Sequence, residues 1–175
     1  MKLILLGGNS AHNKEWIENA KDNLKDLFDE SIVQYYQHWK TDGKINWNIE
    51  VENLIKNIDD SDCVIFAKSA GIGVTLQTIY QKKIKPNKCI FVGIPLEWAE
   101  IHGNNLSPYF VNYKIPTMFI QQTNDPYTSF NDLKLFLKKN KVENYKLKEV
   151  LGNDHDYNDL AEIKKLVRAF VMKIG

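Results

Sequence analysis

Six short runs rich in β-branched and aromatic residues alternate along the chain with longer segments whose apolar residues recur every three or four positions. Runs of the first kind predict buried strands, and the three-to-four spacing predicts amphipathic helices. The six runs are 3–6, 32–36, 63–67, 89–94, 117–121 and 145–151. Strands that alternate with helices favour βαβ units and a mostly parallel sheet. We therefore predict an α/β protein, a three-layer α/β/α sandwich.

The helical spacing is clearest in four segments, which are 16–27, 51–58, 133–137 and 160–171. The last of these predicts a terminal amphipathic helix that runs to Gly175 and docks on the sheet. The length of 175 residues fits one domain, so we expect a single domain over 1–175. Residues 95–115 have weak periodicity and several aromatic residues, and we expect them to form a small flap over the site.

Composition and charge exclude several classes of protein. Hydrophobic residues make up 43% and charged residues 26% of the chain, which is typical of globular proteins rather than disordered or membrane proteins. The net charge of +1 provides no field for nucleic acid or anionic lipid, so we expect neither as a partner. Cys63 and Cys89 lie in predicted strands, where we expect reduced, structural thiols. We found no signal peptide or membrane span and expect a cytoplasmic protein.

The segment Ala67-Lys68-Ser69-Ala70-Gly71 follows the third predicted strand, where a helix should begin. Small residues around a serine at a strand-to-helix turn are typical of a nucleophile elbow, usually G-x-S-x-G, because bulky neighbours would collide there. Ala67 replaces the first glycine and adds one methyl group. The alternative is an ordinary serine and glycine turn that caps a helix.

Two later strand ends supply the other groups of a catalytic triad. Asp125 follows the fifth predicted strand and His155 follows the sixth, which is the order Ser, Asp, His of the α/β-hydrolases. We predict that His155 takes the proton of Ser69 and that Asp125 orients the imidazole. Singly, each residue could be a turn or loop residue. Asp154 and Asp156 are weaker candidates for the acid, or for a metal site with Asp159, and we predict no metal.

The first predicted strand ends in Gly7-Gly8-Asn9-Ser10. We expect the backbone amides of Asn9 and Ala70 to form an oxyanion hole, in which one donor can change the rate roughly a hundred- to a thousandfold. The alternative, a phosphate-binding glycine loop, lacks the lysine and hydroxyl residue of a Walker A loop and the spacing of a dinucleotide fingerprint.

These motifs resemble the compact serine hydrolases of the α/β-hydrolase superfamily, the group similar to YdeN and retinoblastoma-binding protein nine. The resemblance covers most of the chain and rests on the glycine turn at 7–10, Lys14-Glu15-Trp16, the elbow, the stretch 124–130 and the element at His155. The chain departs from many relatives at three places: they have His-Gly where it has Gly7-Gly8, Gly where it has Ala67, and Gly directly before the histidine where it has Asn153-Asp154. The first two departures remove no catalytic group. The resemblance implies a six-stranded parallel sheet in the order 2-1-3-4-5-6.

We therefore expect an esterase or thioesterase that forms an acyl-enzyme on Ser69 and needs no cofactor. Without an extensive lid, the pocket should accept short acyl chains, with Trp98, Tyr109 and Phe110 as its walls. Two alternatives remain open: a catalytically silent hydrolase-fold protein that binds a partner, and a peptidase or amidase with the same triad. The sequence does not indicate an oligomeric state.

Overall fold

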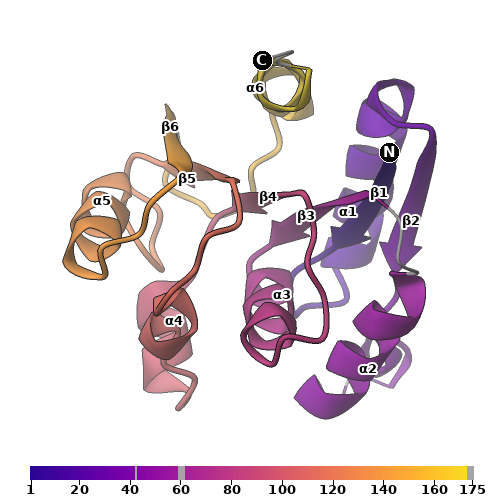
Figure 1. Cartoon of the computed structure of the whole chain (residues 1–175), viewed down its shortest axis with the longest axis horizontal. Coiled ribbons are helices and arrows are strands. Elements are labelled where there is room, and N and C mark those ends of the chain that lie inside the picture. The colour runs from indigo at the N-terminus through magenta and orange to yellow at the C-terminus, as the bar shows by residue number, and fades with distance from the viewer. Residues whose placement is uncertain (42, 59–61, 173–175) are drawn as a thin grey trace.

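Among residues 1–41, 43–58 and 62–172, which the computed structural model describes, six parallel strands form one sheet. The strand order is β2-β1-β3-β4-β5-β6, as predicted (Figure 1). The strands are β1 (Lys2–Leu6), β2 (Glu30–Gln34), β3 (Cys63–Lys68), β4 (Lys88–Val92), β5 (Thr117–Gln122) and β6 (Tyr145–Val150).

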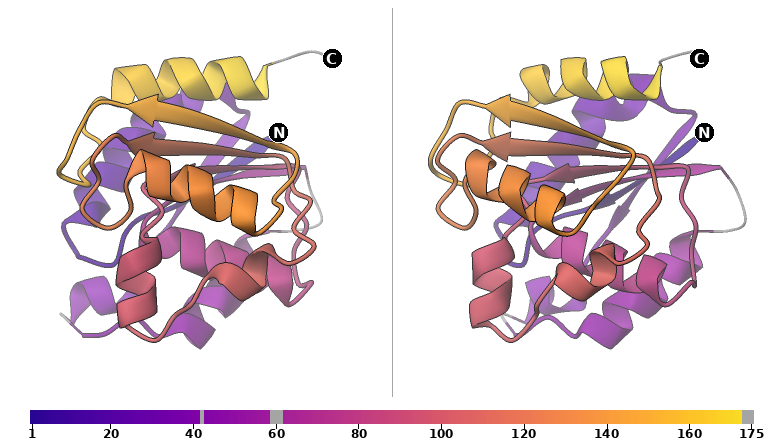
Figure 2. Two further views of the ribbon diagram at one scale, coloured as in Figure 1. Left: turned by 90° about the vertical axis from the view of Figure 1, so that its left-hand side faces the viewer. Right: turned by 60° about the vertical axis from the view of Figure 1, so that its left-hand side comes forward.

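Helices cover both faces of this sheet, so the three-layer sandwich is confirmed (Figure 1, Figure 2). One face carries α1 (Asn13–Leu24) and α6 (Leu160–Val171). The other face carries α2 (Trp47–Asn57), α3 (Ala70–Tyr80), α4 (Leu96–Ile101) and α5 (Phe130–Lys139). Right-handed crossovers produce this division, because the chain moves from β1 to β2 in one direction and from β2 to β6 in the other. Short 3-10 helices follow α1, β2 and α4, at η1 (Lys25–Leu27), η2 (Gln37–Lys40) and η3 (Ser107–Phe110).

The core lies on both sides of the central strands. Every residue of β3 and β5 is buried, as are four of the five residues of β4. Strands buried on both faces are continuous apolar runs rather than alternating ones, which is why the sequence shows runs such as Val64-Ile65-Phe66. Phe91 and Phe119 meet edge to face on neighbouring strands, with ring centroids 5.6 Å apart.

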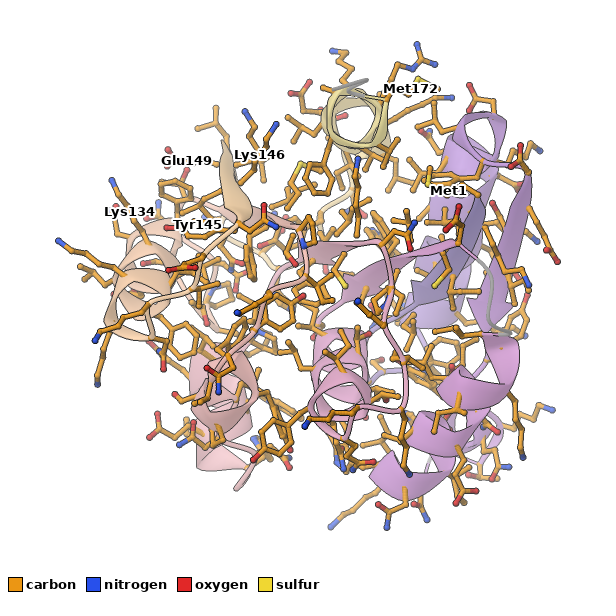
Figure 3. The ribbon with its side chains drawn as sticks, viewed as in Figure 1. Met1, Lys134, Tyr145, Lys146, Glu149 and Met172 are labelled. Atoms are coloured by element: carbon orange, nitrogen blue, oxygen red, sulfur yellow. The ribbon has the colours of Figure 1, made fainter. Side chains whose placement is uncertain are left out.

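The edge strand β6 differs from the central strands. Its residues are either partly buried or exposed, and Lys146 and Glu149 are among the exposed ones (Figure 3). Charged side chains on an edge strand discourage pairing with another chain. This strand therefore ends the sheet, and its carboxyl end still delivers the loop that carries His155.

The predicted elements agree with the structure, with shifts at their ends. The second strand was predicted at 32–36 but lies at Glu30–Gln34, because Tyr36 leaves the ladder and donates its hydroxyl proton to the carbonyl oxygen of Gly7, 3.0 Å away. Cys63 and Cys89 are buried and form no disulfide, as expected. The predicted end of the last helix at Gly175 lies outside the described residues. No helix in the described part of the chain is long and apolar enough to cross a membrane.

Gly71 allows α3 to pack directly against the end of β1. A Cβ atom at position 71 would lie 2.7 Å from the Leu6 Cβ and 2.9 Å from the Gly7 carbonyl oxygen, closer than real Cβ contacts. The Gly71 N–H donates to that same carbonyl at 3.1 Å. The elbow after β3 and the loop after β1 are therefore held side by side.

Gly71→Ala tests this close approach. Alanine is favoured over glycine in a helix by about 1 kcal/mol, yet here its methyl group would meet backbone that cannot rotate away. We expect the free energy of unfolding in urea to fall by about 1–3 kcal/mol. In the control Gly43→Ala, the nearest atom is the Thr41 hydroxyl at 3.1 Å, and we expect a change within about 0.5 kcal/mol. A stabilised Gly71→Ala variant would contradict the prediction.

Candidate active site

Ser69 occupies a strained turn between β3 and α3. Its φ of 52° and ψ of −118° lie in a region that residues with side chains rarely adopt. The turn is held from both sides: the Ser69 N–H donates to the carbonyl oxygen of Val92 at 3.1 Å, and the Ile72 N–H donates to that of Ser69 at 3.0 Å. Backbone strain of this kind persists only where the surrounding structure enforces it, and it clusters at active sites.

Asp125 is buried after β5 and receives three hydrogen bonds. Its Oδ2 accepts from His155 Nδ1 at 2.7 Å and from the Tyr157 hydroxyl at 2.6 Å, and its Oδ1 accepts from the Tyr127 N–H at 2.9 Å. Burial raises the pKa of this carboxyl, but the hydrogen bonds and the His155 charge together hold the pKa below its ordinary value. Asp125 is therefore an ionised acceptor that fixes the imidazole.

His155 is buried to 8% exposure, with its Nδ1 directed at Asp125. Because Nδ1 donates to the carboxylate, the neutral ring carries its lone pair on Nε2. This Nε2 atom is buried and has no hydrogen-bond partner among the described residues. The Tyr127 ring packs edge-on against the imidazole, with centroids 4.6 Å apart. The unpaired nitrogen is the group in this site that can accept a proton.

Gln122, the last residue of β5, holds the loop that carries His155. Its Oε1 accepts from the N–H groups of Asp154 at 3.1 Å and His155 at 2.9 Å, and its Nε2 donates to Asp154 Oδ1 at 2.8 Å. Gln122 was not among the residues singled out from the sequence, although a buried glutamine at the end of a strand is an unusual choice that signals a polar role.

Tyr157 and Gly93 are two further residues of the site that were not predicted from the sequence. The Tyr157 hydroxyl accepts from the Gln122 N–H at 2.9 Å while donating to Asp125. Gly93 follows β4 with a φ of 63°, and a Cβ there would lie 2.6 Å from the Tyr157 ring and 3.0 Å from His155 Cε1. The end of β4 thus provides the space in which both rings pack.

Asp154 and Asp156, the weaker candidates for the acid, do not contact the imidazole nitrogens. Asp154 Oδ1 instead accepts from the Asp156 N–H at 2.9 Å and from Gln122. The Asp156 amide and the Gln122 side chain lower the pKa of Asp154, which stays an exposed loop residue. Within the described residues, no cluster of three or more His, Cys, Asp or Glu side chains could hold a metal ion.

The loop after β1 faces the elbow and is held by aromatic residues that follow β2. The carbonyl oxygen of Asn9 accepts from Trp39 Nε1 at 3.1 Å and lies 2.6 Å from His38 Nε2. On the other side of the site, Ala70 is the first residue of α3, so its N–H has no acceptor within the helix. The two amides predicted to form the oxyanion hole thus belong to segments that face one cavity.

This cavity has a volume of about 190 Å³. It is lined by Asn9, Ser10, Asn13, Ser69, Pro95, Trp98, Tyr127 and His155. Ser69 and His155 therefore share one cavity, although no hydrogen bond joins the hydroxyl to Nε2 in the described structure. Catalytic hydrogen bonds are often formed only when substrate is bound, so this geometry is compatible with a nucleophile and its base.

Of the three predicted pocket walls, only Trp98 lines the cavity with Ser69. Phe110 is 1% exposed and packs against Phe119 and Phe136 in the core, and Tyr109 packs against Tyr80. Both residues belong to η3, which packs against α3, and the weak periodicity of 95–115 could not indicate this position. The structure does not place them at the site.

The predicted flap begins beside the cavity and is tied down there. The N–H of Leu96 donates to the Thr128 hydroxyl at 2.7 Å, and the N–H of Glu97 donates to the carbonyl oxygen of Tyr127 at 3.2 Å. Gln121 adds a third tie, because its side chain accepts from the Ile94 N–H at 3.0 Å. The start of α4 and the loop that carries Asp125 therefore form one unit.

Solved structures resemble this architecture over nearly its whole length. A serine hydrolase homologue of the α/β type from Coxiella burnetii matches 98% of this chain and 85% of its own, at 16% identity and a TM-score of 0.74. A YdeN-like hydrolase from Pectobacterium atrosepticum matches 97% of this chain and 89% of its own, at 14% identity and a TM-score of 0.72. The chain has the α/β-hydrolase fold. The predicted resemblance is thus confirmed for the fold.

Other matching structures differ in length and in description. An uncharacterized protein from Bacillus cereus matches 97% of the chain at 20% identity and a TM-score of 0.72, but the chain spans only 59% of that protein's length. Further matching structures are described as an esterase and as a lipase-esterase related protein. The sequence matches no protein-family model and no curated protein.

Tyr157→Phe tests the contribution of the tyrosine hydroxyl to this hydrolase-fold site. The change leaves the buried Gln122 N–H without its acceptor and removes one donor from Asp125. We expect the free energy of unfolding at pH 7 to fall by about 1–3 kcal/mol. Urea unfolding of the two proteins measures this difference, and equal stabilities would show that the hydroxyl contributes nothing.

The same variant should show a defined pH dependence. Because the folded pKa of Asp125 is lowered, its ionisation stabilises the protein above the unfolded pKa, and this stability is lost as the pH falls through the folded pKa. Without the tyrosine donor, the pKa of Asp125 in the folded protein rises. Ionisation of Asp125 then contributes less to the free energy of unfolding, so less of that free energy is lost in acid. We expect the stability difference between parent and variant to shrink when unfolding is measured below about pH 4.

Proposed function

We propose that the protein is a serine hydrolase that cleaves small carboxylic esters or thioesters through an acyl-enzyme on Ser69. The observation that carries the proposal is the buried pair of Asp125 and His155, 2.7 Å apart, which shares a cavity with a serine held in a strained turn. Nucleophile, base and orienting acid are the three groups that acyl transfer by serine needs.

The proposed acylation begins when the Ser69 hydroxyl turns toward His155 Nε2. The proton moves to Nε2 while Oγ bonds to the carbonyl carbon, and the carbonyl electron pair moves onto its oxygen. The amides of Asn9 and Ala70 would stabilise that oxyanion. The intermediate then collapses, the bond to the leaving group breaks, and the alcohol or thiol leaves with the proton from Nε2.

Deacylation repeats these steps with water. His155 Nε2 takes a proton from water as the oxygen attacks the acyl carbon, and the same proton returns to Ser69 Oγ as the acid departs. Throughout, Asp125 stays ionised and stabilises the imidazolium, since its hydrogen bonds keep its pKa low. The reaction uses only side chains, backbone amides and water.

The cavity supports a small substrate. Its volume of about 190 Å³ is below the 300–1,000 Å³ that is usual for ligand sites. Trp98, Tyr127 and Pro95 form its apolar wall and suit a short acyl chain. The names of the matching structures, which include an esterase, a lipase-esterase related protein and a serine hydrolase homologue, agree with an ester substrate.

Labelling with a fluorophosphonate probe tests whether Ser69 is activated. We expect the parent to be labelled, and the Ser69→Ala and His155→Ala variants to lose labelling while remaining folded by circular dichroism. Lys83, exposed beyond the far end of α3, offers the control Lys83→Met, which should be labelled like the parent. A folded parent without labelling would contradict the proposal and favour a silent scaffold that binds a partner.

Ester turnover tests the role of each group in the triad. With short p-nitrophenyl esters, Ser69→Ala should lower kcat by roughly 10⁴-fold or more. Asp125→Asn retains the shape of the side chain but favours the wrong imidazole tautomer, and we expect a loss of roughly 10³–10⁴-fold. An Asp125→Asn variant as active as the parent would exclude Asp125 as the orienting acid.

A matched pair of an ester and an anilide with the same acyl group separates an esterase from an amidase. An amide needs a protonated amine leaving group, which requires a well-aligned acid above the scissile bond. We expect turnover of the ester and thioester to exceed that of the anilide by much more than their intrinsic reactivities differ. Comparable turnover after that correction would instead favour the peptidase or amidase alternative.

A further inference from the structure

Lys68, directly before the proposed nucleophile, places an ammonium group in the interior. The residue is only 5% exposed. Its Nζ donates to Asn13 Oδ1 at 3.1 Å and lies 4.7 Å from the centre of the Trp16 ring. No direct salt bridge to it is formed among the described residues, although buried lysines usually have one, and the carboxylates of Asp125, Asp154 and Asp156 act on it from a longer distance. A buried ammonium group whose direct polar partner is an amide oxygen suggests a specific role.

Asn13 links Lys68 to the loop after β1 through hydrogen bonds. Its Nδ2 donates to the carbonyl oxygen of Ser10 at 3.2 Å, and its backbone N–H donates to the same carbonyl at 2.9 Å. The amide group also covers Gly8, where a Cβ would lie 2.7 Å from Asn13 Oδ1. Asn13 therefore contacts the residues on both sides of Asn9, whose amide is the proposed oxyanion donor.

Asn13 also forms the wall between two cavities. It lines the cavity that holds Ser69 and a neighbouring cavity of about 260 Å³, which Lys68 and Trp16 line as well. From the opposite side, His38 and Trp39 hold the Asn9 carbonyl. The backbone of Asn9 is thus fixed between an aromatic clamp and the Asn13 amide.

The charge of Lys68 decides which way the Asn13 amide faces. An ammonium group has three donors and no acceptor, so it requires the oxygen of the amide and directs Nδ2 toward Ser10. A neutral amine has a lone pair and can accept from Nδ2 instead. Loss of the proton therefore removes the constraint that ties Nδ2 to the Ser10 carbonyl.

The buried position of Lys68 allows its ammonium group to lose a proton at an experimentally accessible pH. Burial lowers the pKa of Lys68 to about 8, and nearby carboxylates oppose the shift only in part. The charged and titratable groups that face it are His12 and Glu15 at the start of α1, Asp125 after β5, and Asp154 and Asp156 after β6. The carboxylates of Asp125, Asp154 and Asp156 act on Nζ through space, without a direct salt bridge among the described residues.

We infer that Lys68 is a positioning residue, whose ammonium group acts through Asn13 to hold the Asn9 amide in place for the oxyanion. The inference rests on the proposed function, because it assigns a role in that same reaction. Lys68 does not touch the substrate; it fixes the hydrogen bonds of a loop that does. The site therefore works best while Lys68 is protonated.

The pH dependence of ester kcat/KM tests the inference. We expect the parent to lose activity as the pH rises through about 8, because the ammonium form is then lost. At pH 7, Lys68→Met should have a kcat/KM lower than that of the parent by roughly ten- to a hundredfold, the effect of a small displacement of the Asn9 amide. This variant should also lack the alkaline decline. Lys68→Arg stays charged at these pH values. Above pH 8 it should therefore retain a larger fraction of its own pH 7 activity than the parent retains of its own. Lys83→Met serves as the control.

An alkaline decline that persists unchanged in Lys68→Met, or an unaltered rate at pH 7, would overturn the inference. A second measurement does not depend on activity. In ¹⁵N-labelled Ser69→Ala, the NMR chemical shift of the Asn13 side-chain amide should change with pH at the same midpoint as that of Lys68 Nζ. An Asn13 chemical shift that does not change over this titration would also overturn the inference. A parent that the fluorophosphonate probe does not label, but that shows coupled titration, would instead contradict the proposed function while supporting the Lys68–Asn13 coupling.

Discussion

The hydrogen bond from the Gly71 N–H to the Gly7 carbonyl is the contact on which the rest of the site depends. It joins the first turn of α3 to the end of β1, and it exists only because Gly71 has no side chain to separate them. The Tyr36 hydroxyl donates to the same carbonyl, so three strand ends meet at one oxygen. This junction sets the distance between Ser69 and the loop that faces it.

Polar groups in the site are organised around Asp125. A buried carboxylate is costly unless its lone pairs are satisfied, and here three donors from the loops after β5 and β6 meet it. Tyr157 and Gln122 extend the same network, so that the carboxylate, the imidazole and the histidine loop are fixed together. Such a network restricts the imidazole to one orientation before any substrate arrives, which is what preorganised catalysis requires.

Three of the seven non-glycine residues with positive φ in the described chain lie at the carboxyl ends of the strands, beside the cavity. Ser69, His155 and Tyr157 all have positive φ values without being glycine, and Gly93 has one beside them. Each non-glycine conformation costs of order 1–3 kcal/mol in isolation and is retained because packing and hydrogen bonds outweigh it. The parallel sheet supports these three conformations, since its six strands end at one edge where their loops contact one another.

The sequence by itself determined most strand and helix segments, the parallel sheet and the three chemical groups that follow the third, fifth and sixth strands. Periodicity and the positions of Ser69, Asp125 and His155 sufficed, because these are local patterns or come from the rule that parallel strands end together. Only the tertiary structure decided that Tyr157, Gln122 and Gly93 hold the imidazole, that Lys68 reaches Asn13, and that Phe110 lies in the core. These contacts join residues distant in sequence, and their partners are chosen by packing and burial, which no local pattern records.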